Sequence, residues 1–156
     1  MDRIPTKFGE FSVWWRNGKL FAIRFPDEPT ADWQSDAAPK KRELLVEWLN
    51  DYCDGLITEF PKSIAIDYSQ YSDFTRRVLE SVAAIPYGMV KTYSMIAREI
   101  GNPRAARAVG NSIGSNLVPV VIPCHRVVRA DGAIGGFTSG VHWKKRLLNL
   151  ENRIHE

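Results

Sequence analysis

The dipeptide Asn17-Gly18 constrains the first part of the fold more than any other short segment. It separates two runs rich in β-branched and aromatic residues, residues 11–15 and 19–25. Asn-Gly between such runs is the strongest short-range sign of a type I′ hairpin, because both turn residues need positive φ. The sequence therefore predicts two antiparallel strands near the start of the chain.

A loop, a helix and a further strand are expected after this hairpin. Residues 26–39 are rich in Pro, Asp and Ala, which favours a loop. Residues 40–53 carry apolar side chains at helical spacing, and Gly55 is suited to end that helix. Residues 63–67 have the composition of a strand. We expect residues 1–68 to form a small sheet-plus-helix domain that supports the fold rather than reacts.

Residues 69–156 differ from this first domain in both pattern and charge. They hold twelve Lys/Arg and six Asp/Glu, whereas residues 1–68 hold nine and twelve. Such an asymmetry suggests that the second half faces a polyanion, although a solvated basic face with no partner is the plain alternative. Ser72 or Asp73 can cap the first helix of this half. We expect a mainly helical, winged-helix-like domain, which makes the whole chain α+β.

Two short helices in this half have the outline of a helix-turn-helix. The first is expected to start at Thr92 and to end at Gly101, and the second covers residues 104–113. Pro103 is suited to the first turn of the second helix. Many helical hairpins share the order of helix, glycine-containing turn and helix, so the outline alone does not establish DNA binding.

The second of these helices carries small residues on its expected outer face. They are Ala105, Ala106, Ala108 and Gly110. A helix that reads the major groove would carry Asn, Gln or Arg there, whereas small side chains allow the close approach that a narrow minor groove requires. Close packing inside the protein is the alternative. Arg104 and Arg107 on the same helix favour nucleic acid.

Composition excludes several classes of protein. With 44% apolar and 25% charged residues, the chain reads as a soluble globular protein. No apolar run approaches the ~18 residues of a membrane span, and the first residues lack the apolar core of a secretory signal. The two cysteines, Cys53 and Cys124, do not suggest a disulfide framework. We expect a cytoplasmic protein, or a nuclear one in a eukaryote, in which Cys53 serves packing only.

Covalent sulfur chemistry is indicated by Cys124 and His125, which follow the apolar, β-branched run 118–122. A thiol at a strand end beside an imidazole is a candidate nucleophile, since the thiolate is the reactive form. In an extended segment, neighbouring side chains point to opposite faces. Direct contact between the two side chains would therefore need a turn, and a bridging water molecule is the other route.

Two segments and one asparagine together closely resemble the sequence pattern of one family. They are Gly101-Asn-Pro-Arg-Ala-Ala-Arg-Ala-Val-Gly110, Asn116 and Ile122-Pro-Cys-His-Arg-Val127. The family is the O6-alkylguanine-DNA alkyltransferases, or methylated-DNA–protein-cysteine methyltransferases. The resemblance covers residues 71–151, whereas residues 1–68 match only in general layout. Some members have a zinc site in that first region, but this sequence has no Cys/His cluster there. We expect no metal and no cofactor.

The resemblance implies a role for each of five residues. Cys124 would accept an alkyl group irreversibly from the O6 atom of guanine, in a single-turnover reaction. His125 would relay the thiol proton through a water molecule, and Glu151 would orient His125. Tyr93 matches a phenol that hydrogen-bonds N3 of the base, although a buried core tyrosine is the plain alternative. Asn116 matches the residue that ties the helix-turn-helix to the active-site segment.

Further residues match the family's contacts to the base and to DNA. Backbone groups of Cys124 and Val127 would hold the exocyclic amine, and the amide of Thr138 would approach O6. The residues that match flanking positions in the pocket are Pro119 and Phe137. Arg107 matches an arginine that fills the stack when the nucleotide flips out. The resemblance thus implies binding of double-stranded DNA containing O6-alkylguanine through its minor groove, and we expect a monomer.

Three other functions are considered. A non-catalytic lesion sensor on the same scaffold has tryptophan in place of the nucleophile, so Cys124 argues against it. A sequence-specific regulator would need base-reading side chains on the second helix, where alanines stand. A thiol hydrolase would need direct contact between Cys124 and His125, and it would leave the DNA-facing features unexplained.

Overall fold

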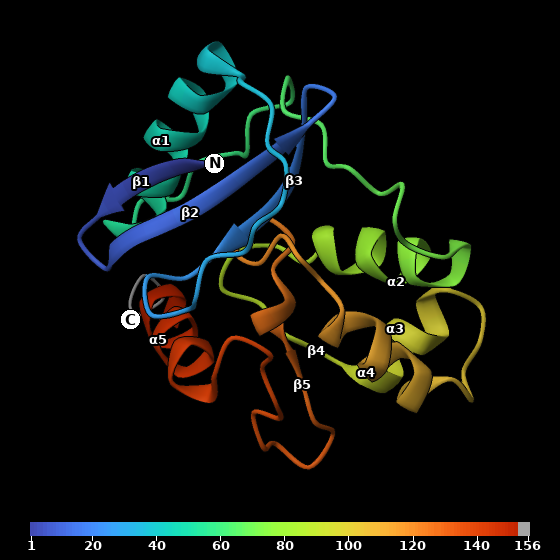
Figure 1. The fold of residues 1–156 in the computed structure, drawn as a ribbon. Helices are drawn as coiled ribbons and strands as arrows, with labels where there is room; N and C mark the ends of the chain where they lie inside the picture. The colour runs from blue at the N-terminus through green and yellow to red at the C-terminus, as the bar shows by residue number, and fades with distance from the viewer. Residues whose placement is uncertain (153–156) are drawn as a thin grey trace. The chain divides into compact units, whose positions relative to one another are not determined.

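The chain folds as two units, Met1–Ser69 and Gln70–Glu156, in a computed structural model. The structure describes residues 1–152, so residues 153–156 at the end of the predicted second domain lie outside the described part. An antiparallel sheet with a helix forms the first unit and the second is mainly helical, which confirms the predicted α+β class (Figure 1). No helix within residues 1–152 has the length and apolar character that a membrane span requires.

The sheet of the first unit has three antiparallel strands. In spatial order they are β1 (Asp2–Thr6), β2 (Gly9–Arg16) and β3 (Lys19–Arg24). Asn17 and Gly18 join β2 to β3 with φ of 51° and 72°, so the type I′ hairpin is confirmed. The sequence does not predict β1, because it contains Pro5. A proline is tolerated there since β1 is an edge strand.

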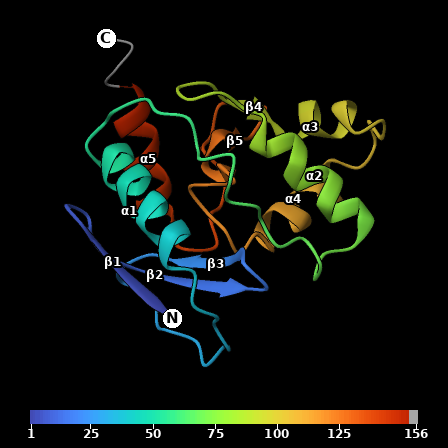
Figure 2. The same cartoon turned by 90° about the horizontal axis from the view of Figure 1, so that it is seen from above.

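The helix α1 (Pro39–Cys53) covers one face of this sheet (Figure 2). It begins one residue before the predicted range 40–53. Leu45 and Leu49 are fully buried on its inner side, and burying a leucine contributes ~1.5–3 kcal/mol. Cys53 at the helix end is buried in the core, where packing was expected to be its role.

The strand predicted over residues 63–67 is wrong. The segment forms only an isolated parallel bridge between Leu20 and Ile66. Asp67 explains why pairing stops, because its Oδ1 accepts hydrogen bonds from the amide of Ser69 at 2.9 Å and from its hydroxyl at 2.6 Å. This local turn directs the backbone away from β3 before a ladder can form.

The second unit begins with a capped amphipathic helix, α2 (Asp73–Ala83). Of the two candidate caps, Ser72 is the one observed, and its Oγ accepts from the amide of Thr75 at 3.2 Å. The cap satisfies a donor that the first turn of a helix leaves unpaired.

The helix α3 (Tyr93–Glu99) begins one residue after its predicted start, because Thr92 is its cap. Thr92 accepts from the amide of Met95 at 3.2 Å, so the helix starts at Tyr93. Gly101 follows its end with φ of 80°, a conformation that favours glycine.

The second helix of the pair, α4 (Ala106–Gly114), begins two residues later than predicted. The amide of Ala105 donates to the carbonyl of Asn102 at 3.0 Å, so these residues form a turn rather than the first turn of a helix. Pro103 and Arg104 therefore lie before α4, and the proposed place of Pro103 inside its first turn is wrong.

A two-rung parallel ladder lies between the helix group α2–α4 and the last helix (Figures 1 and 2). The strand β4 (Lys91–Thr92) pairs with β5 (Val127–Val128), which follows the 3-10 helix η1 (Cys124–Arg126). The last helix, α5 (Val141–Asn152), contacts η1. The ladder thus connects the start of α3 to the end of η1.

Candidate active site

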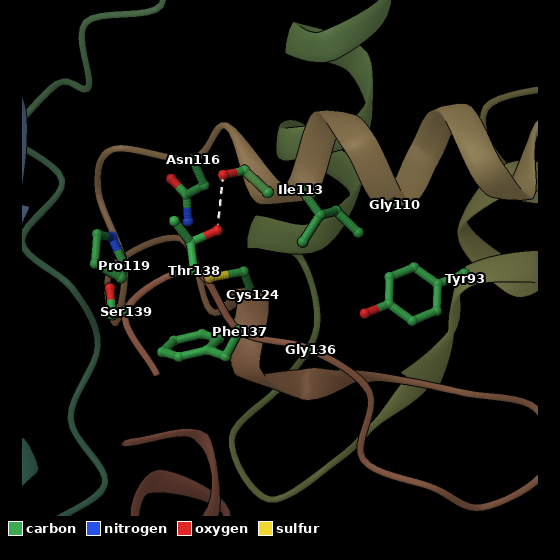
Figure 3. A pocket seen from close by; sticks show the side chains of 11 residues that line it. Tyr93, Gly110, Ile113, Asn116, Pro119, Cys124, Gly136, Phe137, Thr138 and Ser139 are labelled. Atoms are coloured by element: carbon green, nitrogen blue, oxygen red, sulfur yellow. Dashed lines mark hydrogen bonds between the residues drawn. The ribbon is translucent and has the colours of Figure 1, made fainter. Parts of the chain in front are cut away.

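A pocket of about 350 Å³ in the second unit contains Cys124 (Figure 3). It is walled by α3, α4, the segment before η1 and the loop before α5. The residues that line it are Tyr93, Gly110, Ile113, Gly114, Asn116, Pro119, Cys124, Gly136, Phe137, Thr138 and Ser139. Cys124 is only 7% exposed, so the pocket is the route by which a reagent reaches its sulfur.

The backbone that presents Cys124 is a turn, and the strand expected over residues 118–122 is wrong. Val120 has φ of 71° and is buried, which is a strained conformation for a β-branched residue. The amide of Ile122 donates to the carbonyl of Val118 at 2.9 Å, and Pro119 removes a donor that a ladder would need. The turn and η1 place Cys124 at the pocket instead of at a strand end.

Asn116 holds this turn with both ends of its side chain. Its Nδ2 donates to the carbonyl of Ile122 at 3.1 Å, and its Oδ1 accepts from the amide of Val118 at 2.9 Å. Asn116 directly follows the end of α4 and lines the same pocket as Cys124. It therefore connects the helix pair to the segment that carries the thiol, where the resemblance placed it.

Burial raises the pKa of the Cys124 thiol to about 11, although a hydrogen bond with Asn116 and the charge of Lys144 act in the opposite direction. The sulfur is therefore a protonated thiol at neutral pH before any ligand binds. A protonated thiol is a weak nucleophile, so reaction requires removal of this proton.

His125, the next residue of η1, is not among the residues that line the pocket and is completely buried. Its Nε2 is 2.5 Å from Oε2 of Glu151 on α5. Burial lowers the pKa of His125, and the Glu151 carboxylate opposes that change. A hydrogen bond from Nε2 to the carboxylate makes Nδ1 the basic nitrogen of the neutral ring.

The Glu151 carboxylate is bound by His125, by Arg126 and by the amide of Gly88, which donates to Oε1 at 3.1 Å. Arg126 donates to it twice, from Nε to Oε1 at 2.8 Å and from Nη2 to Oε2 at 3.1 Å. Burial alone would raise the pKa of Glu151, but His125 and Arg126 together lower it to about 2. Arg126 also donates to the carbonyl of Ile85 at 2.6 Å. The sequence reasoning did not assign Arg126 a role, although it stands inside the quoted motif.

Tyr93 points its hydroxyl into the pocket, toward the region of Cys124 (Figure 3). Burial raises its pKa, and a charge on Cys124 acts in the same direction. The residue is half-buried at the start of α3, so it is not the core tyrosine of the alternative reading. A protonated phenol facing a pocket is a hydrogen-bond donor for a ligand.

The residues predicted on the outer face of α4 separate into two groups. Arg107 and Ala108 are exposed, whereas Ala105 and Ala106 are half-buried. The prediction that Gly110 lies on the outer face is wrong, because Gly110 lines the pocket and packs against the ring of Tyr93. Helical spacing alone could not reveal this, since the pocket lies beside the helix and is formed partly by other segments.

The loop before α5 covers the pocket from the other side. Thr138 Oγ1 donates to the carbonyl of Gly114 at 2.9 Å, which ties the loop to the end of α4 (Figure 3). Phe137 and Pro119 line the pocket, where the resemblance placed them. Val127 is buried in β5, where its carbonyl oxygen accepts a hydrogen bond from Lys144 at 2.7 Å. Lys144 was not singled out from the sequence.

The titratable groups described here do not form a metal centre. Within residues 1–152, no group of three or more His, Cys, Asp or Glu side chains is placed to hold a metal ion. Near Cys124, the side chains of His125 and Arg126 instead form hydrogen bonds with Glu151.

Comparisons with known proteins match both the sequence and the fold. The family described as "6-O-methylguanine DNA methyltransferase, DNA binding domain" matches residues 73–153. A methylated-DNA–protein-cysteine methyltransferase of Mycolicibacterium paratuberculosis is 45% identical over 154 residues, which cover 96% of this chain and 90% of the relative. A protein of the same name from Methanothermobacter thermautotrophicus is 37% identical over 141 residues, covering 89% and 77%.

A crystal structure of Mycobacterium tuberculosis OGT in complex with DNA matches with a TM-score of 0.83 and 34% identity, over 97% of this chain and 91% of that one. The fold and site are those of a DNA-binding protein with a cysteine in a pocket beside paired helices. The chain belongs to the 6-O-methylguanine DNA methyltransferase family.

Proposed function

We propose that this protein repairs DNA by transferring the alkyl group of O6-alkylguanine irreversibly to Sγ of its own Cys124. The observation that carries the proposal is a free, buried thiol that lines a pocket beside a helix pair. The names of the relatives from Mycolicibacterium paratuberculosis and Methanothermobacter thermautotrophicus, and the DNA bound to OGT, support the same activity. DNA is the partner, and the alkylated base is the substrate.

The transfer forms an S–C bond as the C–O6 bond breaks. The proton of Cys124 passes through a water molecule to Nδ1 of His125, whose other nitrogen is held by Glu151. The electron pair of the broken bond passes to the guanine, which takes up one proton and becomes the normal base. Tyr93 donates a hydrogen bond to N3 as negative charge develops on the ring. The alkyl group ends on sulfur, and the thiol proton replaces it on the base.

The alkylated base must leave the DNA stack to reach this thiol. Unstacking costs a few kcal/mol, and less for a damaged pair. In this proposal Arg107, which is exposed on α4, fills the vacated stack, and the small, exposed Ala108 beside it permits close approach to a minor groove. Gly110 on the same helix lines the pocket. One helix can thus contact the DNA and receive the flipped base.

The product is a thioether, which neither water nor a thiol cleaves readily. Each molecule therefore reacts once. Because Cys124 is only 7% exposed, an added alkyl group crowds the side chains around the sulfur, and such overpacking typically costs ~1–3 kcal/mol. We expect the alkylated protein to melt at a lower temperature than the free protein. Matched melting curves that show equal or higher stability after alkylation would contradict this expectation.

Intact-protein mass spectrometry tests the proposal. Incubation with a duplex containing O6-methylguanine should add one methyl group to the wild type and to Cys53→Ser, which keeps the pocket thiol. Cys124→Ser should gain none. An unchanged mass with tight binding to the lesion would instead select a non-catalytic sensor. Repeated turnover with an unchanged mass would select a hydrolase.

We also infer that the active form is a monomer. All the residues used above, from Tyr93 to Glu151, belong to the second unit of one chain. Sedimentation of the protein with and without the duplex tests this, and a rate of methyl transfer that rises with the square of protein concentration would contradict it.

A further inference from the structure

Asn111 is an exposed asparagine on α4 that the reaction above does not use. The buried side of this helix is formed by Val109, Ser112 and Ile113. Ser112 is held there by a hydrogen bond between its Oγ and Oγ1 of Thr75 on α2, at 2.8 Å. The side chain of Asn111 has no hydrogen-bond partner among residues 1–152. Its amide group is therefore available to a partner outside the chain.

The helical position of Asn111 aligns it with Arg107, which precedes it by four residues. Successive residues of an α-helix are turned by about 100° and rise by about 1.5 Å. Asn111 is therefore turned by only about 40° from Arg107 and lies about 6 Å farther along the axis. Both side chains are exposed. The arginine proposed to fill the vacated stack thus shares one face of α4 with Asn111.

The same face of α4 borders the pocket that contains Cys124. Gly110 directly precedes Asn111, Gly114 follows it by three residues, and both glycines line the pocket. A Cβ atom built on Gly110 would lie 3.7 Å from the ring of Tyr93. Because its helical neighbours on one side line the pocket, Asn111 lies at the edge of that pocket. In the proposed complex, a base that enters the pocket leaves the duplex beside this amide.

The chemistry of Asn111 differs from that of the other exposed residues on this helix. Ala108 has no polar group in its side chain, and Arg107 carries a charge that any phosphate attracts. Asn111 is the only Asn or Gln in α4. Its side chain has one carbonyl acceptor and two N–H donors, and it has no net charge. Such a group gains less from phosphates than a cation does, but it can match the donors and acceptors of a base edge.

The minor groove offers this amide one distinct target, the edge of guanine. A·T and T·A pairs present only the acceptors A N3 and T O2 there, whereas a G·C pair adds the N2 amino donor of guanine. Nδ2 of Asn111 can donate to N3 of a guanine while Oδ1 accepts from the N2 amino group of the same base. An A·T pair would leave Oδ1 without a donor. The chemistry of the side chain therefore favours guanine.

We propose that Asn111 reads a guanine in the minor groove next to the flipped nucleotide, which makes binding of the lesion depend on the surrounding DNA sequence. The inference rests on the proposed function, and in particular on the approach of α4 to the minor groove. The separation of about 6 Å between Arg107 and Asn111 equals about two base-pair steps of about 3.4 Å. The guanine that is read therefore lies within about two pairs of the lesion.

Inosine tests this role, because it lacks the N2 amino group of guanine but keeps N3 and the major-groove edge. Duplexes carry O6-methylguanine flanked by G·C pairs, with guanine on either strand, and inosine replaces one flanking guanine at a time. Fluorescence anisotropy at one salt concentration measures binding to Cys124→Ser, with and without Asn111→Ala. With Cys124→Ser, inosine at one flanking position should weaken binding by about fivefold, the size of one hydrogen bond. With Asn111→Ala added, this loss should disappear.

Asn149→Ala, at an exposed asparagine of α5, is the matched control and should keep the inosine effect. Any effect of inosine on the duplex itself is common to all variants and cancels in the comparison. Uniform weakening by Asn111→Ala on every duplex would indicate a phosphate contact and would overturn the proposal. An inosine effect that is absent, or that persists in Asn111→Ala, would also overturn it. Failure of the wild type to accept methyl from DNA would refute the proposed function instead, and the binding data would still report on Asn111.

Discussion

Arg126 binds both oxygens of Glu151, with Nε 2.8 Å from Oε1 and Nη2 3.1 Å from Oε2. The guanidinium group is a permanent cation, so the carboxylate stays ionised throughout the pH range in which histidine titrates. His125 shares Oε2 of the same carboxylate. The arginine therefore fixes both the charge and the orientation of the group that orients the imidazole.

Glu151→Gln should weaken both stability and reaction. The substitution leaves Arg126 buried without its carboxylate, and breaking such a pair typically costs ~3–5 kcal/mol. Loss of a properly held base should slow methyl transfer by about a hundredfold. Urea unfolding and single-turnover kinetics measure the two effects. Glu80→Gln, which breaks the exposed pair with Arg76, is the control and should cost under ~0.5 kcal/mol.

Gly135→Ala should block the pocket, whereas Gly132→Ala should not. Both glycines have positive φ, 78° and 87°, so either alanine strains the backbone by ~1–2 kcal/mol. A Cβ atom at Gly135 would also lie 3.1 Å from Oη of Tyr93, while nothing lies within 4 Å of one at Gly132. Thermal melting should therefore shift similarly in both variants, and only Gly135→Ala should react more slowly with O6-methylguanine in DNA. Equal rates would show that the loop adjusts.

The contribution of Cys124 to the stability of the protein should fall as pH rises from 9 to 11. The folded state holds the Cys124 proton up to a pKa of about 11, whereas the ordinary value is 9.0. Between these values the folded state binds more protons than the unfolded one, so the contribution of the thiol is present below pH 9 and is lost across this window. The difference in unfolding free energy between wild type and Cys124→Ser measures it. S-methylated protein has no titrating thiol and should follow Cys124→Ser.

Arg107→Ala should reduce repair of duplex DNA far more than reaction with free O6-methylguanine. The free base needs no flipping, so it does not use a side chain that fills the stack. We expect a loss of about tenfold or more with duplex, because unstacking costs a few kcal/mol. Lys62→Ala removes an exposed charge from the first unit and serves as the control. An equal loss with both substrates would contradict the role in flipping.

The structure shows which local signals in the sequence were sufficient. The Asn17-Gly18 turn determines where β2 connects to β3, and the Thr92 cap determines where α3 begins. Both could be predicted because each acts through bonds to immediate neighbours. The family resemblance carried by the motif around Cys124 placed the thiol at a pocket, as the structure shows. Such features depend on few residues, so they can be predicted from a single sequence.

Other features depended on contacts that the sequence does not show. Apolar, β-branched residues before Cys124 suggested a strand, but the turn at Val120 is held by Asn116, and Pro119 has no amide to donate to a ladder. Gly110 faces the pocket because α3 places Tyr93 beside it. Lys144 looks like an ordinary surface lysine on a helix until Val127 and the loop before α5 are seen to enclose it.

The ladder of β4 and β5 pairs Thr92 with Val128, so Tyr93 and Cys124 each lie within a few residues of the same two rungs. The main-chain hydrogen bonds of this ladder therefore set the spacing between the Tyr93 hydroxyl and the Cys124 sulfur, whichever side chains line the rest of the pocket. Substitutions in the loop before α5 could therefore widen the pocket for larger alkyl groups, while Tyr93 and Cys124 keep their spacing.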